Sequence, residues 1–536
     1  MEITKSEEKL KEKTEQLRDY YSLKLEENNK DTQILAKNSE VIQLQTYVFN
    51  KTNFFDDWFR NLKEKDANRI INSKKIGIYK YIFQNTRDST GYNRGEEIEE
   101  VINLKNIVGS ESFYDIYHMI TRKYEFNFNG KKIGIEGLVP KCWDKNPQIR
   151  EEAYKQILEK YSQDSAILSE LYKNIVLDRY NEGVKIHKYK DSLSIFTENS
   201  FITNKALNLM LDIVRKNKDI FSEYFNIKSY FNKKQGYKYN NSKYHLYAPI
   251  IFDEPKKYSF QDMEKIILNT FKRFDERFYV NAKKIFEENH IHAKKMPNKN
   301  KEAFNMKVPN HSPYILINPS GDLKSVLDTM HEFGHAIHDE FSSKQSYFFR
   351  TVPPIIQEIP SIFAETLLHN TMLNNSKNNK EKIEILANLL ESQYQTIVVQ
   401  SYHAMFEKYT HENIPKGASK QDIDNKYYEL LKDRLSTFRI DEAFKEEWLS
   451  IHHFYDNPFY CSGYSWGNLT SLFLYDKYRT EGKKFVDKYV EFLSYGGLKD
   501  TYPLMKILGA NPRKEEFWQT GFDIIKEEIN ELKKLI

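Results

Sequence analysis

The segment that most constrains the fold of this chain is residues 323–341, where an apolar helical stripe runs beside histidines. The members of the stripe recur at the spacing of one helix face: Leu323, Val326, Leu327, Met330, Gly334, Ile337 and Phe341. Gly321 and Asp322 precede the stripe and predict a turn followed by an N-cap. The segment therefore predicts a half-buried helix with its histidines at the edge of the core.

Within this helix, residues 331–335 have the pattern His-Glu-x-x-His. Residues four apart stack on one helix face, about 6 Å apart along the axis. His331 and His335 can therefore bind one metal ion through two imidazoles. Glu332 lies beside the metal, where it can take a proton from a water molecule on it. The alternative is an amphipathic helix whose histidines only pack.

A zinc site of this kind needs a third protein ligand and leaves a fourth position for water. His338 is about 10 Å along the helix from His331, so we expect it to pack or to support the site. Glu358 and Glu365 follow in an apolar helical segment after a loop punctuated by prolines. One carboxylate can bind the metal while the other orients a histidine. Their spacing alone does not choose between them.

These segments together resemble the thimet oligopeptidase and oligoendopeptidase F family of zinc peptidases. The resemblance is carried by Thr-Met-His-Glu-Phe-Gly-His-Ala-Ile-His at 329–338, followed by Glu-Ile-Pro-Ser at 358–361. It implies one zinc ion per chain and Glu358, not Glu365, as the third ligand. It also implies a deep channel between two helical lobes, which would admit short unfolded peptides.

A third segment, residues 452–467, concentrates histidine and tyrosine. Amide hydrolysis builds negative charge on the carbonyl oxygen, and neutral O–H or N–H donors stabilise that charge. The segment resembles the family pattern His-Phe-Tyr…Pro-Phe-Tyr-x-x-x-Tyr, with one extra residue. The resemblance implies Tyr464 as the oxyanion donor, His453 as a donor to the substrate carbonyl and Tyr460 as a groove contact. The extra residue makes His452 a rival of His453, and an aromatic helix packed in the core is the alternative for all four.

Two segments alternate in the manner of β-strands, Lys243–Ile250 and Ser312–Asn318. Pro313 cannot donate a hydrogen bond to a ladder and suits an edge strand. An edge strand beside the metal would let a substrate peptide add as a further strand. A core strand is the equally weighted alternative.

Composition favours a helical chain. Only 19 glycines and 15 prolines interrupt 536 residues, and long stretches carry Leu, Ile, Lys and Glu at helical spacing. The predicted fold is mainly α with a small β-sheet flanking the zinc-binding helix, and the family resemblance implies two helical lobes around a substrate channel. We expect an N-terminal helical lobe over residues 1–145 and a catalytic domain over residues 146–536.

Charge and cysteine content bear on partners and compartment. The net charge is only +4, from 81 basic and 77 acidic residues that are interspersed, which argues against a nucleic-acid surface. No apolar run is long enough to cross a bilayer, and the N-terminus lacks a signal core. Two cysteines without a C-x-x-C motif predict a reducing, cytoplasmic location. The sequence leaves the oligomeric state open.

The predicted function is a zinc-dependent metalloendopeptidase that cleaves short oligopeptides. His331, His335 and Glu358 bind zinc, Glu332 is the base, and Tyr464 with His453 stabilises the intermediate. A zinc exopeptidase and a non-catalytic peptide-binding relative are the alternatives; the latter is expected to have lost Glu332, which is present here.

Overall fold

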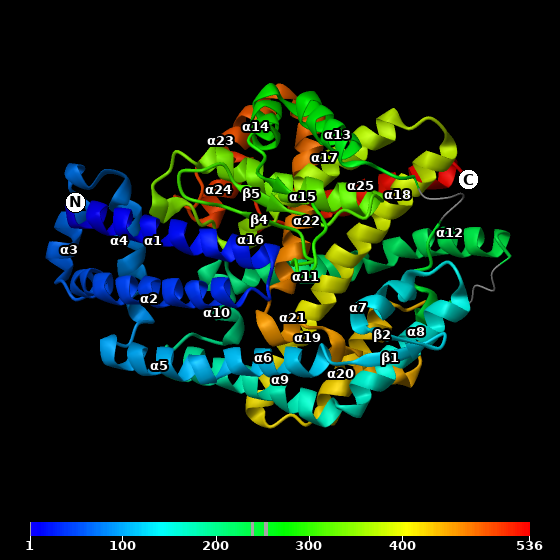
Figure 1. Ribbon diagram of the computed structural model, residues 1–536, viewed down its shortest axis with the longest axis horizontal. Coiled ribbons are helices and arrows are strands. Elements are labelled where there is room, and N and C mark those ends of the chain that lie inside the picture. Colours follow the sequence, from blue (N-terminus) through cyan, green and yellow to red (C-terminus); the bar gives the residue numbers. More distant parts are fainter. Residues whose placement is uncertain (1, 237–240, 251–255) are drawn as a thin grey trace. The chain divides into compact units, whose positions relative to one another are not determined.

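Helices account for most of the chain in the computed structural model, which describes residues 2–236, 241–250 and 256–536 (Figure 1). Residues such as Leu, Lys and Glu lose little side-chain freedom in a helix, and scarce glycine and proline leave long segments uninterrupted. The strands in the described residues are short. The prediction of a mainly α fold with a small sheet is confirmed.

The chain divides into two compact units, each assembled from three separate stretches. Unit 1 comprises Met1–Glu96, Pro255–Thr371 and Leu474–Asn511, and unit 2 comprises Glu97–Glu254, Met372–Phe473 and Pro512–Ile536. The chain therefore passes between the units several times. The division of roles predicted between residues 1–145 and 146–536 stays a prediction.

Unit 1 contains the helix with the His-Glu-x-x-His pattern and a three-stranded sheet. Its elements are α1 (Glu2–Glu27), α2 (Thr32–Arg60), α3 (Glu64–Ile71), α4 (Lys80–Asp88), α13 (Phe260–Phe274), α14 (Glu276–Glu287), β3 (Ile291–His292), β4 (Phe304–Met306), β5 (Tyr314–Leu316), α15 (Leu323–Ser342), α16 (Pro354–Gln357), most of α17 (Ile359–Asn375), α23 (Lys483–Ser494) and α24 (Thr501–Ile507). The sheet and α14 both pack on α15, so the predicted arrangement around this helix is observed.

Unit 2 is a second helical assembly with one β-hairpin. Its elements are α5 (Glu96–Val108), α6 (Ser110–Thr121), β1 (Glu125–Phe128), β2 (Lys131–Gly134), α7 (Ile135–Leu138), α8 (Pro147–Gln163), α9 (Ser165–Arg179), α10 (Ser192–Asn199), α11 (Asn204–Asn217), α12 (Phe221–Lys234), α18 (Asn379–Gln393), α19 (Gln400–Asn413), α20 (Lys420–Arg434), α21 (His453–Asp456), most of α22 (Cys461–Glu481) and α25 (Glu515–Lys534). Its core is rich in aromatic rings, with Tyr172, Phe406, Trp448 and Phe454 in mutual contact.

The strand that precedes α15 is a central strand, not an edge strand. β5 pairs in parallel with β3, where Ile315 lies opposite Ile291, and antiparallel with β4, where Ile315 lies opposite Asn305. Pro313 lies just outside the paired residues, so its missing N–H costs no ladder hydrogen bond. The edge-strand interpretation of Ser312–Asn318 is therefore wrong, and the core-strand alternative is correct.

The strand predicted over Lys243–Ile250 is also wrong. The structure has a 3₁₀ helix at Lys243–His245, followed by turns. The polar members of this segment are buried along with the apolar ones, because the Lys243 ammonium forms an ion pair with Glu447. Alternation of residue types therefore did not correspond to alternation of exposure.

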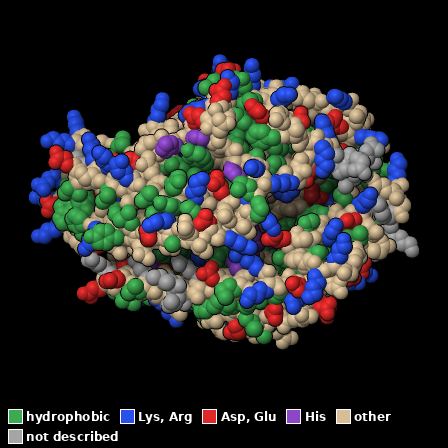
Figure 2. All heavy atoms as spheres, viewed as in Figure 1, with side chains coloured by type: hydrophobic (Ala, Val, Ile, Leu, Met, Phe, Trp, Pro, Cys, Tyr) green, Lys and Arg blue, Asp and Glu red, His purple; other side chains and the backbone are tan. Residues whose placement is uncertain are grey.

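Helix α1, which packs against α2, exposes apolar side chains and buries polar ones. Ile3, Leu10 and Leu17 recur every seven residues along α1 and are between 40% and 54% exposed. Figure 2 shows hydrophobic side chains gathered over these two helices. The buried positions of α1 are instead polar, and Lys11 pairs there with Glu7 at 2.6 Å. This pattern reverses the usual arrangement of a surface helix.

Candidate active site

The helix that carries the histidines begins where the sequence predicts. Asp322 caps α15, because its carboxylate accepts a hydrogen bond from the backbone N–H of Ser325 at 2.9 Å. Gly321 has φ of 78°, a left-handed conformation that glycine adopts at little cost. Met330 and Ile337 are buried in the core. The N-cap fixes where α15 begins, and the buried stripe fixes its rotation about the helix axis. His331 and His335 therefore lie at the edge of the core.

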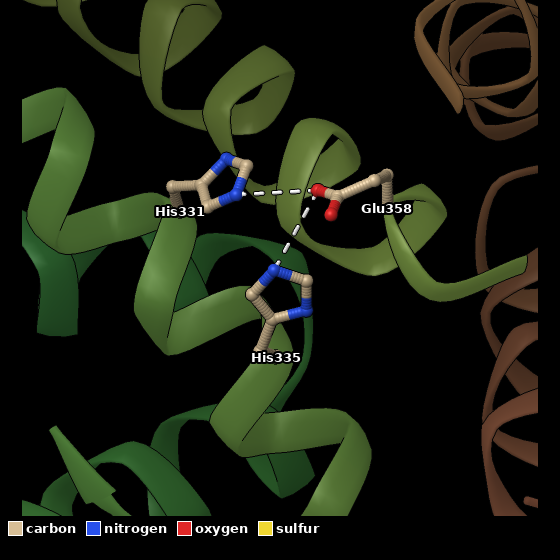
Figure 3. Close-up of side chains that lie close together, drawn as sticks. All are labelled: His331, His335 and Glu358. Atoms are coloured by element: carbon tan, nitrogen blue, oxygen red, sulfur yellow. Dashed lines mark ion pairs between the residues drawn. The ribbon is translucent and has the colours of Figure 1, made fainter. Parts of the chain in front are cut away.

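His331 and His335 converge on one oxygen atom of Glu358 (Figure 3). The His331 Nε2 atom lies 3.3 Å from Glu358 Oε2, and the His335 Nε2 atom lies 3.6 Å from the same oxygen. Both imidazoles are partly exposed, whereas Glu358 is only 7% exposed. Three potential metal-ligating atoms therefore face a common point from two separate elements.

Glu358 lies at the junction of α16 and α17. Its carbonyl oxygen accepts a hydrogen bond from the N–H of Ile362 at 3.1 Å and begins the ladder of α17. The Ser361 hydroxyl lies 2.9 Å from this carbonyl oxygen and 3.1 Å from Glu358 Oε2, and it can donate to both. Ser361 therefore holds both the backbone and the carboxylate of Glu358.

Gly334 allows α15 and α17 to approach closely enough for this convergence. A Cβ atom at this position would lie 2.5 Å from the Pro360 carbonyl oxygen and 2.5 Å from the Ser361 Cα. Both are backbone atoms of α17, which cannot rotate away as a side chain can. The glycine lies between His331 and His335 on α15, so it fixes the distance at which the two imidazoles meet Glu358.

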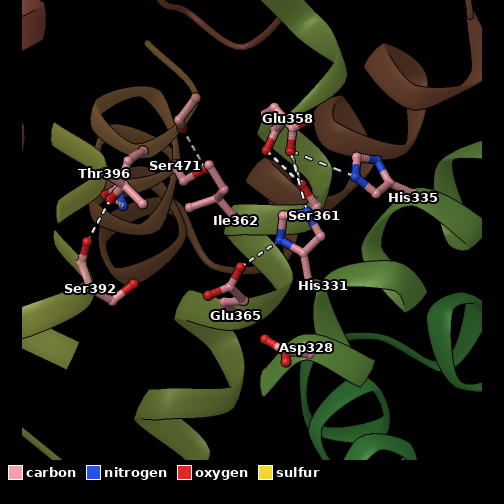
Figure 4. Close-up of polar contacts among 12 residues, drawn as sticks. Asp328, His331, His335, Glu358, Ser361, Ile362, Glu365, Ser392, Thr396 and Ser471 are labelled. Carbon is pink, nitrogen blue, oxygen red and sulfur yellow. Dashed lines mark hydrogen bonds and ion pairs between the residues drawn. The ribbon is translucent and has the colours of Figure 1, made fainter. Parts of the chain in front are cut away.

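Glu365 contacts a histidine instead of joining this group. Its Oε1 atom lies 2.6 Å from the Nδ1 atom of His331, on the side of the ring away from Glu358 (Figure 4). Burial alone would lower the pKa of His331, but its hydrogen bonds to Glu358 and Glu365 raise that pKa well above the ordinary value. The structure thus separates the two carboxylates that sequence spacing left equivalent.

Glu332 lies next to His331 on α15 and is only 7% exposed. Burial and the negative charge of Glu358 raise the pKa of this carboxyl to about 7, although the charge of His331 opposes them. A carboxyl group with a pKa near neutrality can both accept and release a proton at physiological pH. This is the property required of a general base that later acts as an acid.

His338 packs into the core, which agrees with its exclusion as a ligand. It is 6% exposed, and its ring stacks on Phe492 of α23 with 6.4 Å between centroids. Burial and the charge of Lys307 lower the pKa of His338 to about 3. The residue is therefore a neutral packing group at physiological pH.

The donor set of His331, His335 and Glu358 fits zinc. The three ligand atoms lie within 4.8 Å of one another. Four ligands placed tetrahedrally at 2.0–2.1 Å from zinc are about 3.3 Å apart, close to the 3.3 and 3.6 Å observed between the imidazole nitrogens and the carboxylate. Two imidazoles and one carboxylate are also the ligand types of hydrolytic zinc sites.

The second predicted cluster lies in unit 2, where His453, Tyr460 and Tyr464 group together and the His452 ring lies 4.2 Å from the His453 ring. The His453 ring is 5.9 Å from Tyr464 and 6.4 Å from Tyr460, and the two tyrosines meet edge to face at 5.1 Å. All three are partly exposed. They are therefore not an aromatic cluster sealed inside the core.

The structure also distinguishes the two adjacent histidines. His452 precedes α21 and is exposed, whereas His453 opens α21 and lies against the tyrosines. Burial, followed by the neighbouring charge of His452, lowers the pKa of His453 to about 4. His453 is therefore a neutral imidazole that can donate an N–H to a carbonyl oxygen at physiological pH.

Two contributors to the metal-ligating group were missed as functional residues. Ser361 is visible in the sequence as the serine of Glu-x-x-Ser, but only its hydrogen bond to Glu358 gives it a role. Gly334 was assigned to the apolar stripe, whereas its function is to admit the backbone of α17. The sequence signal for this role of Gly334 is a glycine placed between two histidines of a half-buried helix.

The family model of peptidase family M3 matches residues 143–524 of this chain. Together with the mainly helical fold and the His-His-Glu group, this match places the chain among the metallo-oligopeptidases. The chain belongs to peptidase family M3, which confirms the resemblance stated from the sequence.

Individual relatives agree with this assignment. The chain is 26% identical to an oligoendopeptidase F homolog of Borreliella burgdorferi over 96% of this chain and 88% of that protein. It is 24% identical to oligopeptidase PepF of Bacillus subtilis over 76% of this chain, but the match spans only 61% of that protein. The crystal structure of oligoendopeptidase F from Enterococcus faecium superimposes with a TM-score of 0.74 and 17% identity, covering 100% of this chain and 92% of that one.

The described residues add two observations on partners. They include no helix long and apolar enough to span a bilayer. On the face drawn in Figure 2, lysine and arginine side chains are intermingled with aspartate and glutamate. That face therefore offers no continuous basic surface of the kind that nucleic-acid-binding proteins present.

Proposed function

We propose that this protein is a zinc-dependent endopeptidase that hydrolyses peptide bonds in short oligopeptides. The observation that carries the proposal is the convergence of His331, His335 and Glu358 beside a buried Glu332. Membership of peptidase family M3 supports peptides as the substrate class. The two cysteines are free and buried, which supports the reducing, cytoplasmic location expected from the sequence.

Zinc bound by these three residues would act as a Lewis acid toward the attacking water and the scissile carbonyl. Glu365 holds Nδ1 of His331, so that Nε2 faces the metal position. Ser361 holds the carboxylate of Glu358 from the other side. The chain thus orients at least two of its three ligands through hydrogen bonds.

Glu332 moves the proton in this proposal. It accepts a proton from the attacking water and passes it to the nitrogen of the leaving amine. A pKa raised to about 7 by burial suits both steps, because neither the protonated nor the ionised form is strongly disfavoured. Peptide-bond cleavage is complete when the amine carries this proton.

Tyr464 and His453 stabilise the negative charge on the substrate carbonyl oxygen in this proposal. At physiological pH the Tyr464 phenol donates its O–H, and the neutral His453 imidazole donates its N–H. Tyr460 packs edge to face on Tyr464 and would contact the substrate. The exposed His452 would at most contact the peptide.

The first test is chelator-sensitive hydrolysis of a quenched fluorescent peptide of about nine residues with both termini blocked. We expect activity that disappears with a zinc chelator and returns when zinc is restored. Cleavage that requires a free terminus would support the exopeptidase alternative instead. Binding without any cleavage would support the non-catalytic relative.

Variants assign the roles in the same assay. Glu332→Gln should keep zinc and lower kcat by about a hundredfold to ten-thousandfold, the range for a lost general base. Glu358→Gln should lose zinc as well as activity. Glu340→Gln is the matched control, since Glu340 lies on the same helix but pairs with Lys284. Full activity in Glu332→Gln would refute its assignment as the base.

A further inference from the structure

Phe459 is a buried, bulky residue in the left-handed region of backbone conformation. Its φ is 65°, and it is only 2% exposed. The other non-glycine residues with positive φ in the described ranges are exposed, and most of them are asparagines, which tolerate this conformation. A bulky residue in this region costs free energy, and such residues concentrate at functional sites. The turn that contains Phe459 is therefore a candidate for a functional role.

This turn joins α21 to α22 and lies between the two proposed carbonyl donors. His453 opens α21, Tyr464 lies in the first turn of α22, and residues 457–460 connect the two helices. Tyr460 directly follows Phe459, and its ring lies 5.1 Å from that of Tyr464 and 6.4 Å from that of His453. The backbone conformation of Phe459 therefore sets how the chain enters α22, and with it the separation of the two donors.

Glu407 of α19 holds the backbone of Phe459. The Glu407 Oε1 atom accepts the Phe459 N–H at 2.8 Å, and Glu407 is fully buried. The Phe459 ring lies 5.0 Å from the ring of His411, which is one turn further along α19 and also buried. One helix thus contacts both the backbone and the side chain of the left-handed residue.

Two more hydrogen bonds hold the ends of the turn. The Arg179 Nη2 atom, at the end of α9, donates to the carbonyl oxygen of Asp456 at 3.1 Å, where α21 ends. The Ser462 hydroxyl donates to the carbonyl oxygen of Phe459 at 2.6 Å, where α22 begins. The turn is therefore attached to α9 and α19 as well as to its own neighbours. Donors carried on a turn held in this way need little rearrangement when charge develops on a substrate.

We propose that Glu407 is a positioning residue for peptide hydrolysis, which holds His453 and Tyr464 in register by accepting the Phe459 N–H. The proposal rests on the function proposed above and adds a residue to it. Glu407 touches no reacting atom and acts through the turn. Its loss should lower kcat more than it raises KM, because misplaced donors weaken the stabilisation of charge that develops in the transition state.

The test compares Glu407→Met with Glu407→Gln in hydrolysis of the blocked fluorescent peptide by zinc-loaded protein. Methionine is similar in size but offers no oxygen, whereas glutamine keeps an acceptor oxygen for the Phe459 N–H. We expect Glu407→Met to lower kcat by about tenfold to a hundredfold, the effect of displacing a catalytic group by about 1 Å. KM should change little, and Glu407→Gln should retain most of the activity. Glu412→Met, at an exposed position on the same helix, is the control and should have the kinetics of the parent protein.

A double-mutant cycle separates positioning from general damage to the fold. Tyr464→Phe removes a hydroxyl on which Glu407 is proposed to act. Glu407→Met should therefore lower kcat much less in the Tyr464→Phe protein than in the parent, whereas a folding defect would lower it by the same factor in both. Arg179→Gln releases only the Asp456 carbonyl and should show the same non-additivity with a smaller fall in kcat. This variant keeps the test valid if Glu407→Met fails to fold.

Two outcomes would overturn the proposal while the proposed function stands. The first is a parental kcat in Glu407→Met and Arg179→Gln, together with a lowered kcat in Tyr464→Phe. The second is an equal loss of kcat from Glu407→Met with and without the Tyr464 hydroxyl. A parental kcat in Tyr464→Phe would refute both the donor role of Tyr464 and the positioning role of Glu407. Absence of chelator-sensitive cleavage by the parent protein would instead refute the peptidase assignment itself.

Discussion

Glu365 acts on the proposed metal site through His331 rather than by direct ligation. A carboxylate 2.6 Å from Nδ1 keeps a proton on that nitrogen, so Nε2 is the atom left to bind a metal ion. The same contact fixes the rotation of the ring. Glu365 thus sets both the tautomer and the ring orientation of His331 without itself binding the metal.

We expect Glu365→Ala to weaken zinc binding by about tenfold to a hundredfold, the range for loss of a supporting carboxylate. Glu365→Gln keeps an acceptor for the Nδ1 proton and should weaken zinc binding less than Glu365→Ala does. Competition with a zinc-binding dye measures both affinities, with Glu340→Gln as the control on α15. Unchanged zinc affinity in Glu365→Ala would show that His331 needs no orienting partner.

At the scale of secondary-structure elements, the contact between α15 and α17 is the feature on which the site depends. No side chain separates the two helices at Gly334, where a Cβ would overlap the backbone of Pro360 and Ser361. His331 and His335 lie on one helix, and Glu358 lies at the start of the other. Any increase in the spacing of the helices therefore moves the ligands apart.

Gly334→Ala should consequently lower both stability and zinc affinity. We expect a loss of about 1–3 kcal/mol in the free energy of unfolding, the usual effect of overpacking, and weaker zinc binding in a dye competition. Gly463→Ala is the matched control, since a Cβ at this helical glycine meets open space. The free energy of unfolding of Gly463→Ala should equal or exceed that of the parent protein. Equal effects of the two substitutions would contradict a steric role for Gly334.

The elements that could be predicted from sequence are those fixed by local patterns. The stripe from Leu323 to Phe341 and the cap at Asp322 depend only on neighbours along the chain, and α15 matches them. The strand prediction for Lys243–Ile250 was wrong because Lys243 is buried in an ion pair with Glu447, a residue distant in the sequence. The position of β5 between β3 and β4 depends on strands that sequence alternation did not reveal.

The same distinction applies within the candidate site. His331, Glu332 and His335 are placed by helical periodicity, so their relation could be derived in advance. The choice between Glu358 and Glu365 depends on how α17 crosses α15, which spacing cannot supply.

At the scale of the whole molecule, a buried acid makes stability depend on pH. Glu407 of α19 is fully buried, and its Oε1 atom accepts the Phe459 N–H at 2.8 Å. Burial raises the pKa of this carboxyl to about 8, although the Phe459 hydrogen bond and the charge of Arg179 lower it. Between its unfolded pKa near 4.5 and about 8, the folded protein keeps a proton that the unfolded chain releases. Rising pH therefore favours unfolding across this window.

We expect the free energy of unfolding to fall by up to about 1.4 kcal/mol per pH unit from this group between pH 5 and 8. Glu407→Gln cannot ionise and should flatten this dependence, so that the variant is more stable than the parent at pH 9. Urea unfolding at pH 5, 7 and 9 measures the effect. Glu412→Gln, at an exposed position on the same helix, should show the same pH dependence of stability as the parent protein. If the stability of Glu407→Gln also changed with pH as that of the parent does, Glu407 would not be a buried neutral acid.

The separation of the three proposed ligands along the chain has a consequence for handling the protein. A metal held by His331, His335 and Glu358 would act as a removable cross-link that closes the loop of residues 336–357. Such a cross-link restricts the unfolded chain and binds only the folded one. Free metal at a hundred times its dissociation constant would add about 2.7 kcal/mol to the stability of the fold. Protein prepared with and without a chelator would therefore differ in its resistance to heat and proteolysis before any substrate is added.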